Sequence, residues 1–192
     1  MVIGSHVIFG AYGFWLPNDP RGSWSDFVGS WDLFRYGAAT KTTERRSVAA
    51  RPHDARQRLA AKSALKLPAV HFSPQQIEAV ASGFAEYSQR SKLVVWACAV
   101  LPDHVHLVLG RHRLDVEPLV IQLKGAATRE LVASGLHPFA AAGRPAKCFA
   151  RGEWKVFLGS VDDVRRAIRY VEANPGKEGL ARQRWGFVEE YE

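Results

Sequence analysis

The fold of this chain is decided by one stretch, LVVWACAVLPDHVHLVL, at residues 93–109. Residues 93–101 are apolar without interruption, which favours a central strand buried on both faces. Pro102 and Asp103 predict a tight turn, and residues 104–109 then read as a returning strand. The stretch therefore predicts an antiparallel hairpin in the middle of a sheet.

Signals on both sides of this hairpin predict the other elements of the fold. A strand is expected at 5–14 and another at 153–158, and helices are expected from Ser73 onward, at 115–134 and at 160–174. Pro175 is expected to stop the last helix. The order strand, helix, hairpin, helix, strand predicts an α+β, ferredoxin-like (RRM-like) fold, with helices on one face of an antiparallel sheet.

The excess positive charge is concentrated after the first strand. The chain has 26 Lys and Arg against 19 Asp and Glu, a net charge of +7. Residues 41–66 hold eight basic and two acidic residues, and 54–65 predict a short basic helix. We expect one domain, 1–192, with a basic, irregular insertion at 18–72. Such a surplus suits a polyanionic partner, and a solvated surface without a partner is the alternative.

Composition excludes several classes of protein. With 47% hydrophobic and 11% aromatic residues, the chain is not disordered throughout, collagen-like or a coiled coil. The longest apolar run has nine residues, too short for a membrane-spanning helix, and the first fifteen residues do not resemble a secretory signal. Cys98 and Cys148 give no disulfide framework. We therefore expect a cytoplasmic protein without a membrane partner.

His104 and His106 are the first candidates for chemistry. On a strand, residues two apart project from the same face, so both imidazoles point together. Two neighbouring imidazoles make half a metal site, and a further ligand has to come from elsewhere. A purely structural role for the pair is the alternative at this point.

The last predicted helix carries further candidates. Tyr170 and Asn174 are four residues apart, so they lie on one stripe of the helix, away from its apolar face. A helix packed beside the hairpin would bring a nucleophile and a third ligand to the histidines. The alternative is an exposed tyrosine with an asparagine that caps the helix end.

Three segments resemble a known family. The segment LPDHVHL, residues 101–107, resembles the HUH signature (histidine, bulky hydrophobic residue, histidine) of the single-tyrosine transposase superfamily, which includes the insertion-sequence-200-like enzymes. The segment YVEANPGKEGL, residues 170–180, is similar to the tyrosine-helix motif of REP-associated tyrosine transposases (RAYT). YGFWLPNDPRGS, residues 12–23, is similar to the N-terminal motif of a transposase-like subgroup. Gly176 departs from the pattern, which has a larger apolar residue there.

The resemblance implies a function and its parts. His104, His106 and Asn174 would bind Mg²⁺ or Mn²⁺, and Tyr170 would cut single-stranded DNA at hairpin-associated sites through a 5′-phosphotyrosine. No nucleotide cofactor is expected, because no phosphate-binding P-loop motif is present and the phosphotyrosine retains the bond energy for rejoining. A nucleoid-associated protein, either monomeric or homodimeric, fits this activity.

Basic and aromatic side chains are candidates for contacts to DNA. Backbone contacts are expected from Arg111, Arg113, Lys124, Arg129, Arg166, Arg21, Arg45 and Arg46. Trp24 or Trp31 is available to stack on unpaired bases. Each of these residues has a plain alternative as a surface charge or a core indole.

Two other functions compete with the transposase. The first is a non-catalytic, domesticated protein that binds single-stranded nucleic acid. The RNA-recognition form of this alternative predicts aromatic residues on the central strands, and residues 104–109 have none. The second is a metal-dependent phosphoesterase that activates water and does not need Tyr170.

Overall fold

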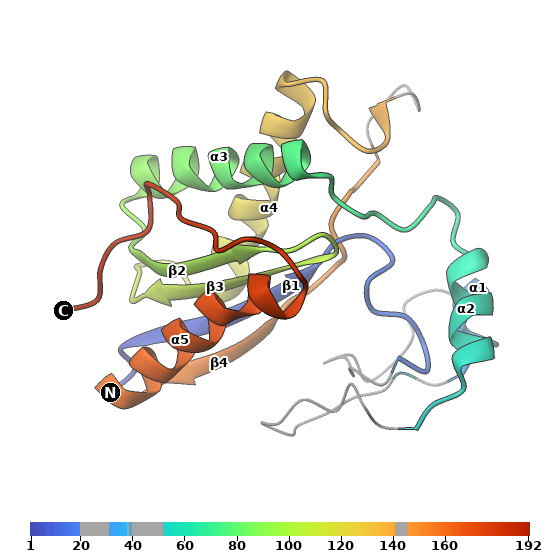
Figure 1. Ribbon diagram of the computed structural model, residues 1–192, viewed down its shortest axis with the longest axis horizontal. Helices are drawn as coiled ribbons and strands as arrows, with labels where there is room; N and C mark the ends of the chain where they lie inside the picture. The colour runs from blue at the N-terminus through green and yellow to red at the C-terminus, as the bar shows by residue number, and fades with distance from the viewer. Residues whose placement is uncertain (20–30, 38, 40–51, 141–145) are drawn as a thin grey trace.

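The computed structural model describes residues 1–19, 31–37, 39, 52–140 and 146–192. Along the chain the elements are β1 (Gly4–Gly10), α1 (Trp31–Phe34), α2 (Ala55–Ser63), α3 (Pro74–Ser91), β2 (Val95–Val100), β3 (His104–Gly110), α4 (Val116–Ala133), β4 (Trp154–Leu158) and α5 (Val161–Lys177). The strands form one sheet in the order β2-β3-β1-β4, and every neighbouring pair is antiparallel. This order and the α+β class confirm the predicted ferredoxin-like fold (Figure 1).

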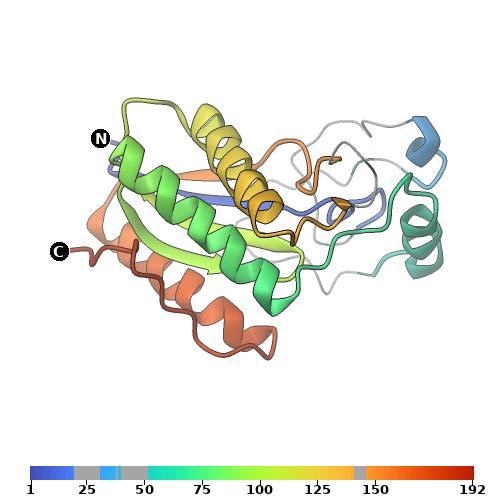
Figure 2. The same cartoon turned by 90° about the horizontal axis from the view of Figure 1, so that it is seen from above.

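The helices lie on both faces of the sheet, whereas the sequence predicted them on one. Helices α3 and α4 cover one face, and α5 covers the other (Figures 1 and 2). The second face accepts a helix because β2 presents two small residues there, Ala97 and Ala99, which pack with Val164 and Val171 of α5. The candidate residues of α5 and β3 therefore share a layer separate from the main core.

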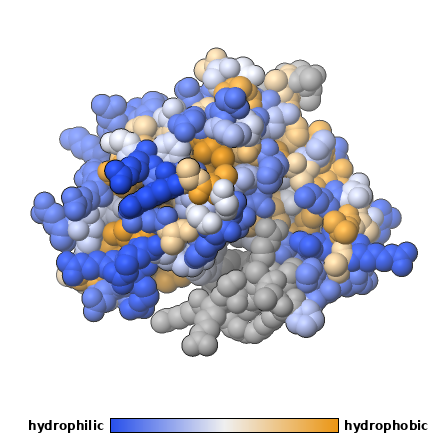
Figure 3. Space-filling view, viewed as in Figure 1, coloured by the Kyte–Doolittle hydropathy of each residue, from blue (hydrophilic) through white to orange (hydrophobic). Residues whose placement is uncertain are grey.

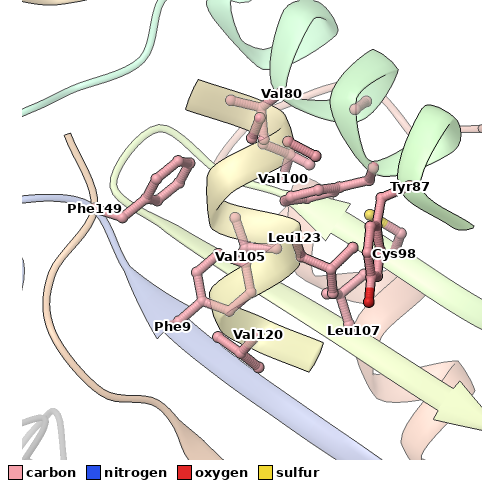
Figure 4. Close-up of a cluster of buried hydrophobic side chains, with 14 of the residues drawn as sticks. Phe9, Val80, Tyr87, Cys98, Val100, Val105, Leu107, Val120, Leu123 and Phe149 are labelled. Atoms are coloured by element: carbon pink, nitrogen blue, oxygen red, sulfur yellow. The ribbon is translucent and has the colours of Figure 1, made fainter. Parts of the chain in front are cut away.

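The main core fills the space between the sheet and the pair α3 and α4. Phe9 of β1, Leu107 of β3 and Leu123 of α4 are fully buried in it (Figure 4). The two helices approach closely at Gly83, where a Cβ atom would lie 2.6 Å from the Cα of Ala127. Glycine is needed at this position because no side-chain atom fits between the two backbones.

Local signals explain where α3 and α5 begin. The Ser73 hydroxyl accepts a hydrogen bond from the Gln76 amide at 3.3 Å, and the Gln76 side chain accepts one from the Ser73 amide at 2.8 Å. This confirms the predicted capping box. The Ser160 hydroxyl likewise caps α5 by accepting from the Asp163 amide at 3.1 Å.

The predicted end of α5 is wrong. Pro175 lies inside the helix, which continues to Lys177. Proline removes one helical N–H, but at this position the helix ends within a few residues, so little hydrogen bonding is lost. The Leu180 amide then bonds the Pro175 carbonyl at 2.8 Å and closes the end. As a result, Lys177 joins the helical stripe of Tyr170 and Asn174.

The C-terminal segment runs back along the outer edge of β2 (Figure 1). The Gln183 side chain accepts from the Val100 amide at 2.9 Å and donates to its carbonyl at 2.7 Å. Further along, the Glu189 amide donates to the carbonyl of Val95 at 2.8 Å. These bonds occupy backbone groups that would otherwise form an open sheet edge.

The described part of the insertion contains two helices that stand apart from the sheet (Figures 1 and 2). Asp54 caps α2 by accepting from the Gln57 amide at 2.9 Å, as the sequence predicted. The single-domain interpretation with 18–72 as an insertion stays a prediction. None of the helices among the described residues has the length and hydrophobicity needed to cross a membrane.

Candidate active site

The two candidate histidines lie side by side on the face of the sheet that α5 covers. Their ring centroids are 4.9 Å apart. Val105, between them in sequence, is fully buried in the core on the opposite face. The strand alternation predicted from the sequence therefore places both imidazoles together.

Helix α5 brings Tyr170 to His106. The Tyr170 ring centroid lies 5.7 Å from that of His106, with the rings inclined at 69°. Tyr170 is 44% exposed, so solvent or a ligand has access to it, whereas His106 is only 4% exposed. Asn174 is buried one turn further along the helix. The structure therefore brings Tyr170 beside His106, and the roles predicted for these residues stay predictions.

Lys177 was not singled out from the sequence, because the helix was expected to end before it. Its ammonium nitrogen lies 4.2 Å from the centroid of the Tyr170 ring and donates to Asn174 Oδ1 at 3.2 Å. Because a lysine has only donors, the asparagine must present its oxygen on this side. The amide oxygen that was predicted to bind a metal therefore already accepts a hydrogen bond from a positively charged group.

His6 of β1 is a second residue missing from the sequence prediction. Its Nε2 lies 3.2 Å from Nδ1 of His106, and both side chains are buried. Strand β1 lies beside β3, and the Cα atom of His6 is paired with that of Val108, so His6 and His106 share a face. The Trp154 ring also contacts His6, with centroids 5.4 Å apart and planes inclined at 89°.

Asp103 and Phe14 contact His104. His104 Nδ1 is 2.7 Å from Oδ1 of Asp103, and the Phe14 ring stacks on the imidazole at 4.6 Å. A carboxylate accepts hydrogen bonds, so the proton of His104 sits on Nδ1 and its Nε2 keeps a lone pair. This arrangement is typical of histidines that bind metals.

Burial sets the protonation states in the site. It lowers the pKa of His6 to about 4. Burial also lowers the pKa of His106 well below its ordinary value, and positive charge on neighbouring groups, Lys177 among them, acts in the same direction. Both imidazoles are therefore neutral at pH 7, which is the form that binds metal ions. Burial raises the pKa of Tyr170, and a hydrogen bond with Asn174 opposes that effect.

The chemistry of these side chains fits a divalent cation. The imidazoles of His104 and His106 supply nitrogen, and Asn174 supplies an oxygen that already contacts a cationic group. No group of three or more His, Cys, Asp or Glu side chains within the described ranges forms a metal site. The protein therefore offers few strong ligands, and water or phosphate oxygens would have to complete the coordination of Mg²⁺ or Mn²⁺.

Comparisons with solved structures place transposases among the similar folds. A REP-associated tyrosine transposase bound to a REP hairpin is 13% identical, with a TM-score of 0.49, over 94% of this chain and 72% of that chain. A proposed transposase from Deinococcus radiodurans R1 is 15% identical, with a TM-score of 0.42, over 90% of each chain. No family model and no curated protein matches this chain.

The predicted DNA-binding residues on α4 are not brought to Tyr170, because α4 lies on the opposite face of the sheet. Lys124 donates to the carbonyls of Ala150 at 2.9 Å and Gly152 at 2.6 Å, and burial lowers its pKa to about 8. The structure thus gives Lys124 a structural role. Arg129 lies 4.0 Å from Glu86 on the surface.

The remaining predicted contacts are spread over the molecule. Arg166 is one turn before Tyr170 on α5 and pairs with Asp163 at 3.5 Å. Hydrophilic side chains predominate on the face of the molecule that shows α5 (Figure 3).

Arg111 and Arg113 are exposed and follow β3, at the end opposite His104. Outside the described residues lie Arg21, Arg45, Arg46 and Trp24, as well as the side chain of Trp31. All of these DNA contacts stay predictions.

Proposed function

We propose that this chain is a metal-dependent nuclease and transposase that cuts and rejoins single-stranded DNA through Tyr170. The observation that carries the proposal is the half-exposed phenol of Tyr170, 5.7 Å by ring centroid from a buried, neutral His106. The Tyr170 ring also lies 5.7 Å by centroid from His6, and the Lys177 ammonium lies 4.2 Å from the Tyr170 centroid. The motifs of residues 101–107 and 170–180 support the same assignment.

In the proposed reaction the phenolic oxygen of Tyr170 attacks a backbone phosphorus. A bond forms between that oxygen and phosphorus, and the bond from phosphorus to the 3′-oxygen breaks. The phenol proton passes to water, and the 3′-oxygen takes up a proton to leave as a hydroxyl. The DNA 5′-phosphate stays on the tyrosine, and attack by a 3′-hydroxyl reverses the step to rejoin a strand.

The residues around Tyr170 have separate tasks in this reaction. The raised pKa of Tyr170 keeps the phenol protonated at neutral pH, so the developing phenolate needs positive charge nearby. Lys177 supplies one such charge, 4.2 Å from the ring centroid. A Mg²⁺ or Mn²⁺ ion held by His104, His106 and Asn174 would neutralise the scissile phosphate. The net charge of +7 supports a nucleic-acid substrate, and hairpin DNA is the substrate we propose.

The test uses labelled single-stranded hairpin DNA with MnCl₂ and looks for a protein–DNA adduct that survives denaturing electrophoresis. Wild type is expected to form the adduct, and Tyr170→Phe and His104→Ala are expected to lose it. Tyr191→Phe is the matched control, because its ring contact with Trp96 needs no hydroxyl. Cleavage without an adduct would instead indicate a phosphoesterase that uses water. Binding without cleavage would indicate a non-catalytic module.

A further inference from the structure

His6 is a buried imidazole that the proposed reaction does not use directly. It projects from β1, a strand with hydrogen-bonded neighbours on both sides, and it is 7% exposed. Its ring lies nearly parallel to that of His106, with planes inclined by 22° and centroids 5.5 Å apart. The shortest contact joins Nε2 of His6 to Nδ1 of His106 at 3.2 Å, a hydrogen-bond distance.

A hydrogen bond between two neutral imidazoles has only two arrangements, because one nitrogen must donate and the other must accept. If Nδ1 of His106 donates, its Nε2 carries a free lone pair. If Nε2 of His6 donates, His106 holds its proton on Nε2 and has no lone pair for a cation. The direction of this one bond therefore decides whether His106 is able to bind a metal.

The neighbouring histidine indicates the direction. Asp103 can only accept, so His104 has its proton on Nδ1 and its Nε2 is free. The rings of His104 and His106 lie on one face of the sheet with centroids 4.9 Å apart. Nδ1 of His104 contacts Asp103, and Nδ1 of His106 contacts His6. Because His6 occupies Nδ1 of His106, only Nε2 of His106 is left for a cation, and the Nδ1–H form is the one that leaves it free. His6 then has the role toward His106 that Asp103 has toward His104.

We propose that His6 is a positioning residue, whose Nε2 accepts the Nδ1 proton of His106 and so leaves Nε2 of His106 free for a divalent cation. This inference rests on the proposed function, because it assumes that His106 is a ligand. The His6 ring also contacts Trp154, at 5.4 Å, and Tyr170, at 5.7 Å, and it is buried. These contacts restrict the movement of the acceptor, which an orienting partner requires.

The direct test is the tautomer of His106 in the free protein. A long-range ¹H–¹⁵N correlation spectrum of ¹⁵N-histidine-labelled protein at pH 7.5, without metal or DNA, separates the two tautomers, and His106→Gln assigns the signal. We expect the Nδ1–H form. The Nε2–H form would overturn the proposal. This measurement needs neither cleavage nor a bound metal, so it fails independently of the proposed function.

A second test uses Mn²⁺ binding measured by calorimetry. His6→Leu removes the acceptor and is expected to weaken Mn²⁺ binding about 10- to 100-fold, the range typical for loss of an orienting partner. His6→Gln keeps an acceptor oxygen and is expected to stay within a few fold of wild type. His71→Gln, at an exposed histidine, is the control. Equal Mn²⁺ affinity of His6→Leu and wild type would overturn the proposal, and if His6→Leu fails to fold, the tautomer of wild type decides.

Tight Mn²⁺ binding that depends on His6, in a protein that forms no DNA adduct, would refute the nuclease and leave the positioning role intact. Adduct formation in a protein whose His106 has the Nε2–H form would refute the positioning role alone. The two proposals are thus separated by these measurements.

Discussion

Acidification is expected to destabilise this protein through the buried imidazole of His6. Burial lowers the pKa of His6 from 6.5 to about 4, so below pH 6.5 the unfolded chain takes up a proton that the folded chain refuses. The stability associated with the neutral ring is complete above pH 6.5 and is lost as the pH falls toward 4. The shift corresponds to about 3 kcal/mol in total, of which about 2 kcal/mol is lost by pH 5.

This loss is large beside the ~5–15 kcal/mol that holds a typical domain together. His106 acts in the same direction, because burial lowers its pKa as well. Urea unfolding at pH 7.5, 6 and 5 measures the effect, with His6→Leu as the variant that cannot be protonated. We expect wild type to lose about 2 kcal/mol more than His6→Leu between pH 7.5 and 5.

The control for this prediction is His71→Gln, which removes an exposed histidine and should follow the wild-type curve. Parallel pH profiles for wild type and His6→Leu would refute the reasoning. In that case the His6 ring would have to be hydrated or protonated in the folded protein, and its contact with His106 could not be that of two neutral rings.

Three further predictions concern packing and charge. Gly83→Ala should lower the free energy of unfolding by about 1–3 kcal/mol, because the new Cβ meets Ala127, and unchanged urea midpoints would contradict this. Burial lowers the pKa of Lys124 to about 8, so between pH 8 and 10 the folded protein loses this proton while the unfolded chain keeps it. The free energy of unfolding of wild type, relative to that of Lys124→Met, should therefore rise over this pH range. A difference in urea unfolding that does not change with pH would contradict this. Lys177→Met should tighten Mn²⁺ binding about fivefold in calorimetry, because it removes a positive charge beside Asn174 that is worth ~1 kcal/mol, and weaker binding would show that Lys177 supports the site.

The parts of the site that depend on local periodicity could be predicted from the sequence. Strand alternation placed His104 and His106 on one face, and helical spacing placed Tyr170 and Asn174 on one stripe. The structure places Tyr170 of this stripe beside His106, with ring centroids 5.7 Å apart. The chemical roles of these four residues stay predictions, because periodicity determines position and not reactivity.

The parts that depend on distant pairing could not be predicted. His6 reaches His106 only because β1 and β3 pair in one register, and a shift by one residue would turn His6 to the opposite face. That register joins residues 100 positions apart in sequence, so no local pattern reports it. Lys177 was missed for a local reason, because Pro175 was expected to end the helix when it only weakens its last turn.

The position of α5 connects the stability of this fold to its chemistry. The apolar side of the helix, with Val164 and Val171, packs against the alanines of β2, and its polar stripe is thereby turned toward His6 and His106. Buried neutral imidazoles weaken this layer at low pH, so the core on the opposite face must supply the stability that the site lacks. A ferredoxin-like sheet with only its α3 and α4 layer would bury a core but have no tyrosine beside its histidines. Helix α5 is the element that makes the second face a site.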